Sequence, residues 1–128
     1  MAKFSDEKVD RITALSAILA EKHPVAFPSP KPGNSSTVLK VGIHKDISAL
    51  YPEVSRRTLS GFMSWHTRSP KYLGAASVAG TARYDLDGNI VGHVTEDQAK
   101  AAKAQLAERK AKRRAAKAAT KQEGQTTS

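Results

Sequence analysis

The chain has 128 residues, a formal net charge of +9 and a pI near 10, and it contains no cysteine. The absence of cysteine excludes disulfides, thiolate metal sites and cysteine nucleophiles, and no apolar run approaches the roughly 18 residues that a membrane-spanning helix needs. Because the first residues are charged and do not resemble a signal peptide, we expect a soluble cytoplasmic protein. Its charge favours an anionic partner, nucleic acid first and an acidic membrane surface second.

The charge is concentrated in two regions. Residues 98–128 carry nine Lys or Arg against two acidic residues, a net of +7, whereas residues 1–97 carry twelve against ten. Within that larger part, the segment 40–83 has seven basic and two acidic residues, a net of +5. A basic middle and a basic carboxy-terminal tail therefore both require an explanation.

The first predicted helix covers residues 6–23, with Ser5 as its capping residue. Apolar residues at helical spacing give it one core-facing stripe. The stripe consists of Val9, Ile12, Leu15, Ile18 and Leu19. Pro24 ends the helix, and a proline-rich loop follows, from which Val25 and Phe27 are expected to reach the core.

Short elements are predicted next along the chain. Residues 37–43 form an extended segment, and residues 45–51 form a short helix. Its expected inward residues are Ile43, Ile47 and Leu50.

Two further helices begin at capping serines. Ser55 opens a helix over residues 56–68 whose inward residues are expected to include Leu59, Phe62, Met63 and His66. Gly61 inside this helix costs about 1 kcal/mol relative to alanine, so it is either tolerated or leaves room for a neighbouring backbone. Ser69 and Pro70 open the next helix in the preferred way, and the small residues 74–80 are expected to form a connection.

The acidic segment 85–96 admits two interpretations. Positions 1, 3, 5 and 12 of a calcium loop would be Asp85, Asp87, Asn89 and Glu96. However, Ile90 occupies position 6, where such a loop needs glycine. Asp87-Gly88 between two β-prone runs instead favours a hairpin with a two-residue type I′ turn, and residues 95–98 match a capping box. We therefore predict a hairpin followed by a helix, and no metal site.

The last helix is expected to begin at Thr95 and to end between residues 110 and 118, with disorder after Gly124. Its alanine and charged residues are strong helix formers, but no large apolar side chain follows Leu106. The tail is therefore either a solvated extension or an electrostatic arm for nucleic acid. The candidate RNA-binding residues of the arm are Arg109, Lys110, Lys112, Arg113 and Arg114.

Two of the predicted helices begin with basic residues. Arg56 and Arg57 follow one capping serine, and Lys71 and Tyr72 follow the other, so cations lie beside free backbone N–H groups in an arrangement that can bind phosphate. Tyr72 could also stack on a sugar or base. Composition is equally compatible with the alternative, in which these cations are ordinary surface charges and Tyr72 fills part of the core.

Five segments together resemble one family. They are HPVAF (23–27), LKVGIHKDI (39–47), SRRTL (55–59), HTRSPKYL (66–73) and GTARYDLDGNIVGHVT (80–95), in the order and spacing of the FinO/ProQ RNA-chaperone domain. The resemblance covers roughly residues 8–108. It implies an α+β, mainly α-helical fold, with about five helices and a short β-hairpin. Residues 1–108 would form the RNA-binding domain, and residues 109–128 a basic tail, helical and then disordered.

The resemblance also implies a function. It implies a bacterial RNA chaperone that binds the base of a terminator-type hairpin and its 3′ single-stranded tail. Such a protein stabilises small RNAs and promotes their pairing with mRNA targets in post-transcriptional regulation. We therefore expect a monomeric, cytoplasmic protein with RNA as its partner, no membrane partner, no cofactor and no enzymatic activity.

The resemblance assigns RNA-binding roles to one concave face. The residues assigned to it are Lys40, Arg56, Lys71, Tyr72 and Arg83. The further candidate RNA-binding residues are Arg57, at the helix opening, and His66 and Thr67, which would lie close to the face. The helix opening at residues 55–57 would hold duplex phosphates, and a pocket near Tyr72 would receive the RNA 3′ end. Three positions depart from the family pattern, because His66 replaces a tyrosine, Lys71 replaces a common arginine, and Ser60 replaces a frequent arginine. The segment between Tyr72 and Gly80 is also about one residue longer.

Other functions fit parts of the sequence. Residues 53–73 resemble two short helices around a turn, so a DNA-binding module is the nearest alternative, and a basic ribosome-associated protein is another. An enzyme is not expected, because the four histidines are scattered and no P-loop, G-x-G-x-x-G or G-x-S-x-G motif is present.

Overall fold

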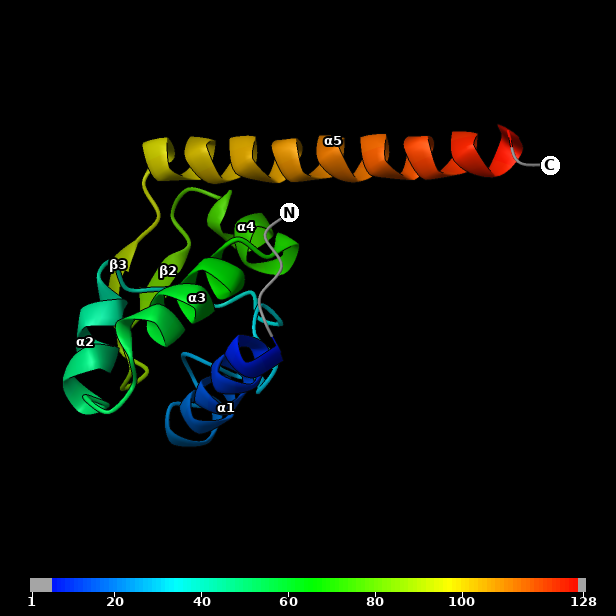
Figure 1. The fold of residues 1–128 in the computed structure, drawn as a ribbon. Coiled ribbons are helices and arrows are strands. Elements are labelled where there is room, and N and C mark those ends of the chain that lie inside the picture. Colours follow the sequence, from blue (N-terminus) through cyan, green and yellow to red (C-terminus); the bar gives the residue numbers. More distant parts are fainter. Residues whose placement is uncertain (1–5, 127–128) are drawn as a thin grey trace.

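The computed structural model describes the backbone of residues 6–126 and the side chains of residues 7–118. Over these residues it contains five helices and a small three-stranded sheet. In chain order they are α1 (Asp6–Lys22), β1 (Val38–Leu39), α2 (Ile43–Leu50), α3 (Arg56–Thr67), α4 (Pro70–Ala76), β2 (Ala82–Tyr84), β3 (Ile90–His93) and α5 (Glu96–Thr126). Helices α1 to α4 and the sheet form one body, and α5 lies across it and extends past it (Figure 1). The predicted mainly helical α+β fold is confirmed.

The core lies between α1, α3 and the loop that follows α1. Phe27 of that loop and Phe62 of α3 are both almost fully buried, and their ring centroids lie 5.7 Å apart. Helix α3 crosses α1 at Gly61, where an added Cβ would lie 2.9 Å from the Ile12 side chain. The space beside this glycine is therefore filled by side chains of α1, and not by the neighbouring backbone that the second explanation requires.

Three residues predicted to face the core are exposed instead. Ile18 is 41% exposed, because α1 packs on α3 through the narrower stripe of its neighbours Ile12, Leu15 and Leu19. Val25 is 50% exposed and lies against the turn at Gly88 rather than in the core. Leu50 is 58% exposed, since α2 buries only Ile43 and Ile47 and ends at this residue.

The predicted helix caps are confirmed where the structure describes them. Ser55 Oγ accepts a hydrogen bond from the N–H of Thr58 at 3.2 Å, and Ser69 Oγ accepts one from the N–H of Tyr72 at 3.4 Å. At the start of α5, Thr95 and Gln98 form the reciprocal capping box, with distances of 3.1 and 3.0 Å. The predicted cap at Ser5 lies outside the described residues.

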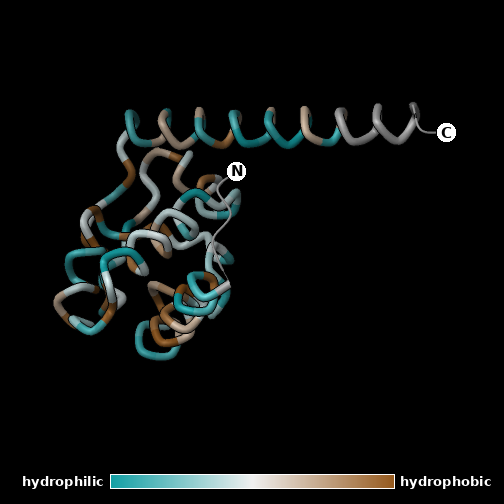
Figure 2. The backbone as a smooth tube through the Cα atoms, in the orientation of Figure 1, coloured by the Kyte–Doolittle hydropathy of each residue, from teal (hydrophilic) through white to brown (hydrophobic). Residues whose placement is uncertain are grey.

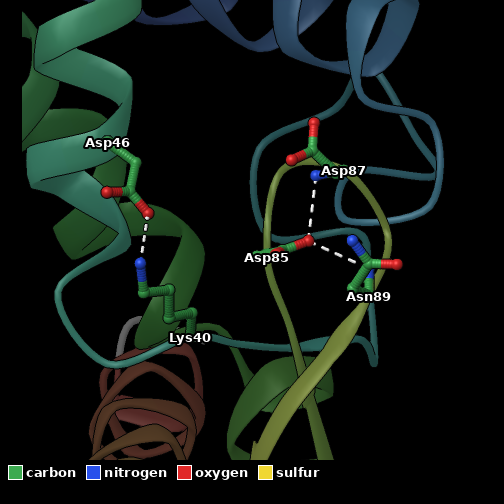
Figure 3. Close-up of polar contacts among 5 residues, drawn as sticks. All are labelled: Lys40, Asp46, Asp85, Asp87 and Asn89. Atoms are coloured by element: carbon green, nitrogen blue, oxygen red, sulfur yellow. Dashed lines mark hydrogen bonds and ion pairs between the residues drawn. The ribbon is translucent and has the colours of Figure 1, made fainter.

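The β2–β3 hairpin is confirmed, but the predicted turn type is wrong. A type I′ turn needs positive φ at both central residues, and within the described chain only glycines, including Gly88 with φ of 83°, have positive φ. Instead, the Asp85 carboxylate accepts hydrogen bonds from the N–H groups of Asp87 and Asn89 at 3.0 and 2.9 Å (Figure 3). The N–H of Gly88 donates to the Asp85 carbonyl at 3.1 Å. The connection between β2 and β3 therefore spans residues 85–89, because the Asp85 side chain organises a longer turn.

The sheet contains one strand more than the predicted hairpin. β1, from the predicted extended segment, pairs parallel to β2, and β2 pairs antiparallel to β3. The predicted connection at residues 74–80 is partly helical, because α4 continues to Ala76.

Helix α5 is longer than predicted, since it continues to Thr126 without a break at residue 108. Its first turns dock on α4 through Ala99, Ala102 and the partly buried Leu106. Beyond them, over residues 107–118, the helix is largely hydrophilic (Figure 2). Extending a helix that is already docked needs no new nucleation, which accounts for its length in an Ala- and Lys-rich sequence. Over the described residues, no helix combines the length and apolar character required to cross a bilayer.

Candidate nucleic-acid interface

Helix α3 separates two hollows in the protein surface. The larger, about 750 Å³, lies between α2 and α3, and the smaller, about 530 Å³, lies between α1 and α3. Arg56, Ser60 and Ser64 line both hollows, because they follow one another at one-turn spacing on the exposed side of α3. We call the larger hollow the α2–α3 groove.

The α2–α3 groove is basic. Lys45 contributes a cation from α2, Arg56 contributes another from the first turn of α3, and Arg68 contributes a third from the residue that ends α3. No carboxylate of the described chain lines it. Clustered cations in a concave surface focus positive potential and attract anions, so the groove is suited to a phosphate backbone.

The predicted phosphate site at the start of α3 lies where the two hollows meet. Arg56 and Arg57 are exposed, and Arg57 lines the smaller hollow, to which α1 contributes Lys8. The Ser55 hydroxyl is occupied at the cap, since it accepts from the N–H of Thr58 and donates to the hydroxyl of that residue at 2.9 Å. Both arginines are therefore exposed beside a helix end whose capping hydroxyl is already hydrogen-bonded.

Tyr72 and Arg83 are placed differently, because their polar atoms bind the protein itself. The buried Leu39 N–H donates to the Tyr72 hydroxyl at 3.1 Å, and Arg83 Nη1 donates to the Leu39 carbonyl at 2.7 Å. Arg83 Nη2 also donates to Gln98 Oε1 at 3.0 Å, and its buried Nε has no partner among the described residues. The structure brings these two predicted site residues together at Leu39, away from the lining of the groove.

Lys40, Thr67 and Lys71 each have an intramolecular partner. Lys40 forms an ion pair with Asp46 at 2.8 Å (Figure 3), and this hydrogen bond and the negative charge raise the pKa of Lys40. Thr67 lines the α2–α3 groove, but its hydroxyl donates to the Met63 carbonyl at 2.7 Å. Lys71 is exposed and donates to the Asn34 amide oxygen at 3.0 Å.

His66 lies in the core and does not join the surface groups. It is 1% exposed, its ring stacks on Phe62 with centroids 5.3 Å apart, and Tyr72 contacts its edge. The N–H of Gly33 donates to His66 Nδ1 at 3.0 Å, which places the ring proton on Nε2, an atom without a described partner. Burial lowers the pKa of His66 to about 4. The ring is therefore neutral at physiological pH and holds the loop at Gly33.

The predicted arm residues lie on α5 beyond its docked part. All of them are exposed, and Lys112 pairs with Glu108 of the same helix at 3.4 Å. They are therefore available to an anionic partner on a helix that extends past the body (Figure 1).

Sequence reasoning missed several residues of the α2–α3 groove. They are His44, Lys45, Ser48, Ser64 and Arg68. The available signal was weak, because Lys45 and Arg68 were visible only as part of a basic middle region. Their convergence depends on how α2 packs against α3.

Comparison with known proteins identifies relatives of this chain. The sequence matches the model of the ProQ/FINO family over residues 9–119. Proteins named RNA chaperone ProQ from Aliivibrio fischeri (strain ATCC 700601 / ES114) and Vibrio vulnificus (strain CMCP6) are 34% identical over 111 residues and 35% identical over 109 residues. These alignments cover 84% and 83% of this chain but 51% of each relative. The chain thus spans about half the length of the curated relatives it matches.

Two solved structures share the fold. The NMR structure of a ProQ homolog from Legionella pneumophila has a TM-score of 0.63 and 32% identity, and the match covers 85% of this chain and 88% of that one. The crystal structure of a FinO-like RNA chaperone from Neisseria meningitidis MC58 also has a TM-score of 0.63, at 22% identity, covering 87% and 85%. The second likeness concerns the fold alone. The FinO/ProQ-like fold expected from the sequence is confirmed.

Tyr72→Phe tests the structural role of the Tyr72 hydroxyl. The substitution keeps the ring but leaves the buried Leu39 N–H without its acceptor, so we expect the free energy of unfolding in urea to fall by about 1–3 kcal/mol. Tyr84→Phe is the matched control, because the Tyr84 hydroxyl makes no hydrogen bond with the described residues. It should change stability by less than about 0.5 kcal/mol. Equal effects of the two substitutions would contradict this role.

The buried neutral His66 makes stability depend on pH. Its folded-state pKa of about 4 lies below the ordinary 6.5, so the unfolded chain binds a proton at a higher pH than the folded chain. The stabilisation that comes from this difference in pKa is complete above pH 6.5. As the pH falls to about 4, it is lost, and the free energy of unfolding decreases by about 3 kcal/mol.

Urea unfolding of the wild type and His66→Asn across this range measures the effect. Asparagine keeps an acceptor for the Gly33 N–H but cannot titrate, so its stability should fall less steeply with acidity. Parallel pH curves for the two proteins would refute the assignment to His66.

Proposed function

This chain belongs to the ProQ/FinO family, and from that premise we propose that it is an RNA chaperone for terminator-type hairpins with a 3′ single-stranded tail. In this role it stabilises small RNAs and promotes their pairing with mRNA targets. Relatives named as RNA chaperones, at 34% and 35% identity, support the proposal. The ProQ/FinO family is not an enzyme family, so the proposed activity consists of binding and release.

The α2–α3 groove is the observation that carries the proposal. A duplex presents two phosphate backbones, and α3 forms a ridge between two hollows, each lined by basic residues. The two strands of a stem can therefore lie on either side of this ridge. No Asn, Gln, Asp or Glu of the described chain lines either hollow to read base edges, which favours recognition by shape and backbone.

Tyr72, Arg83 and Lys40 are positioning residues in this proposal. Tyr72 and Arg83 hold Leu39, and the next residue, Lys40, is bound to Asp46 of α2. The same helix carries Lys45 into the groove. These contacts fix α2 relative to the sheet and therefore fix Lys45 in the groove. One chain supplies the whole site, so binding requires no second copy.

The double substitution Lys45→Ala/Arg68→Ala tests the groove. Removing two phosphate contacts should weaken binding to a hairpin with a 3′ tail by at least about tenfold, and should reduce the slope of log affinity against log salt by about 1.4–1.8. Fluorescence anisotropy across a salt series measures both quantities. Lys22→Ala/Lys31→Ala removes the same charge from exposed positions outside both hollows and should change the slope much less.

Equal slopes for the two double variants would indicate binding by total charge and would overturn the assignment of the groove. Competition with duplex DNA, and with the same hairpin lacking its tail, tests the partner. Equal competition by the tailed hairpin, the tailless hairpin and duplex DNA would favour a general nucleic-acid-binding protein.

We further propose that the basic residues of α5 accelerate pairing of RNA strands by reducing the repulsion between them. Deleting residues 109–128 should lower the annealing rate of complementary RNAs several-fold at low salt, as followed by fluorescence quenching. A full-length variant with Lys110, Arg113 and Arg114 replaced by glutamine separates charge from helix length. Annealing rates unchanged in both proteins would exclude a role for the arm.

A further inference from the structure

Three hydroxyl groups of the α2–α3 groove are not used by the protein itself. Ser48 on α2 and Ser60 and Ser64 on α3 line the groove, and within the described chain their side chains make no hydrogen bond. Thr67 differs, because its hydroxyl is bound to the Met63 carbonyl. A serine hydroxyl can donate one hydrogen bond and accept others, so the groove offers donors and acceptors as well as cations.

On α3, cations and hydroxyls occupy different parts of the groove. Arg56 and Arg68 stand at the two ends of α3, whereas Ser60 and Ser64 lie between them on the same helix. The two serines are separated by four residues, about 6 Å along the helix axis, which is close to the spacing of neighbouring riboses along an RNA strand. A groove that bound phosphates alone would gain more from cations at these central positions.

We propose that Ser60 and Ser64, with Ser48 on the facing helix, bind ribose 2′-hydroxyls of the hairpin stem and so distinguish RNA from DNA. The 2′-hydroxyl is the group that marks RNA at a given site, and A-form RNA displays it across a wide, shallow minor groove. Phosphate contacts cannot make this distinction, since both nucleic acids carry phosphates. The inference rests on the proposed function, in which the same groove holds the stem.

The test replaces the 2′-hydroxyls of the stem by fluorine and leaves the tail unchanged. Fluorine preserves the A-form geometry and the phosphate charge but cannot donate a hydrogen bond. We expect the wild-type full chain to bind the fluorinated hairpin about tenfold more weakly than the all-ribose hairpin, which corresponds to the loss of one or two hydrogen bonds. Ser48→Ala/Ser60→Ala/Ser64→Ala should bind both hairpins with affinities within about twofold of each other.

The alanine variant is suited to this comparison because alanine is a better helix former than serine, and circular dichroism checks that its fold is retained. Ser36→Ala is the matched control, since Ser36 is exposed and lies outside both hollows, and it should discriminate as the wild type does. Equal binding of both hairpins by the wild type would overturn the inference. Discrimination that persists in the triple variant would also overturn it. A wild type that binds the all-ribose hairpin no better than duplex DNA of equal charge would instead refute the proposed function.

Discussion

The backbone of Leu39 is held on both sides by side chains from other elements. Its N–H donates to the Tyr72 hydroxyl on α4, and its carbonyl accepts from Arg83 on β2. Arg83 also binds Gln98 at the start of α5. The hydrogen bonds at Leu39 and Arg83 therefore link β1, α4, β2 and α5. β1 ends at Leu39, and the chain then turns at Gly42, with φ of 82°, into α2. The wall that α2 contributes to the groove therefore depends on the bonds around Leu39.

Two groups of residues can therefore be distinguished: those whose polar atoms hold the fold together, and those whose charges are available to bind a ligand. The terminal nitrogens of Arg83 and the Tyr72 hydroxyl are bound within the protein, and redirecting them to a ligand would leave buried backbone groups unpaired. Lys45, Arg56 and Arg68 line an open groove with no carboxylate of the described chain beside them, so their charge remains available. The same separation divides α5 into a docked start and an exposed basic extension.

Sequence reasoning succeeded where the decisive interactions are local. The caps at Ser55 and Ser69, the capping box and the hairpin each depend on residues a few positions apart, and the structure contains all of them. It failed where contacts between residues far apart in the sequence determine the structure. The exposure of Ile18 and Leu50 depends on how much of α1 and α2 the neighbouring elements cover. The turn differs from the predicted type I′ turn because the Asp85 carboxylate accepts hydrogen bonds from two backbone N–H groups. Helical spacing correctly predicted that His66 points inward, whereas the resemblance placed it close to the RNA-binding face. The groove itself could not be predicted, since Lys45 and Arg68 converge only after α2 packs on α3.

The most direct test of the α2–α3 groove as the RNA site is an NMR titration. Backbone amide signals of the 15N-labelled full chain would be followed as a hairpin with a 3′ tail is added. The groove model predicts that the largest shift changes lie at residues 44–48 and 56–68, while amides on the outer face of α1 change little. Shift changes spread evenly over all basic surfaces would contradict the groove model. Unchanged amide signals in the groove while RNA binds would contradict it as well.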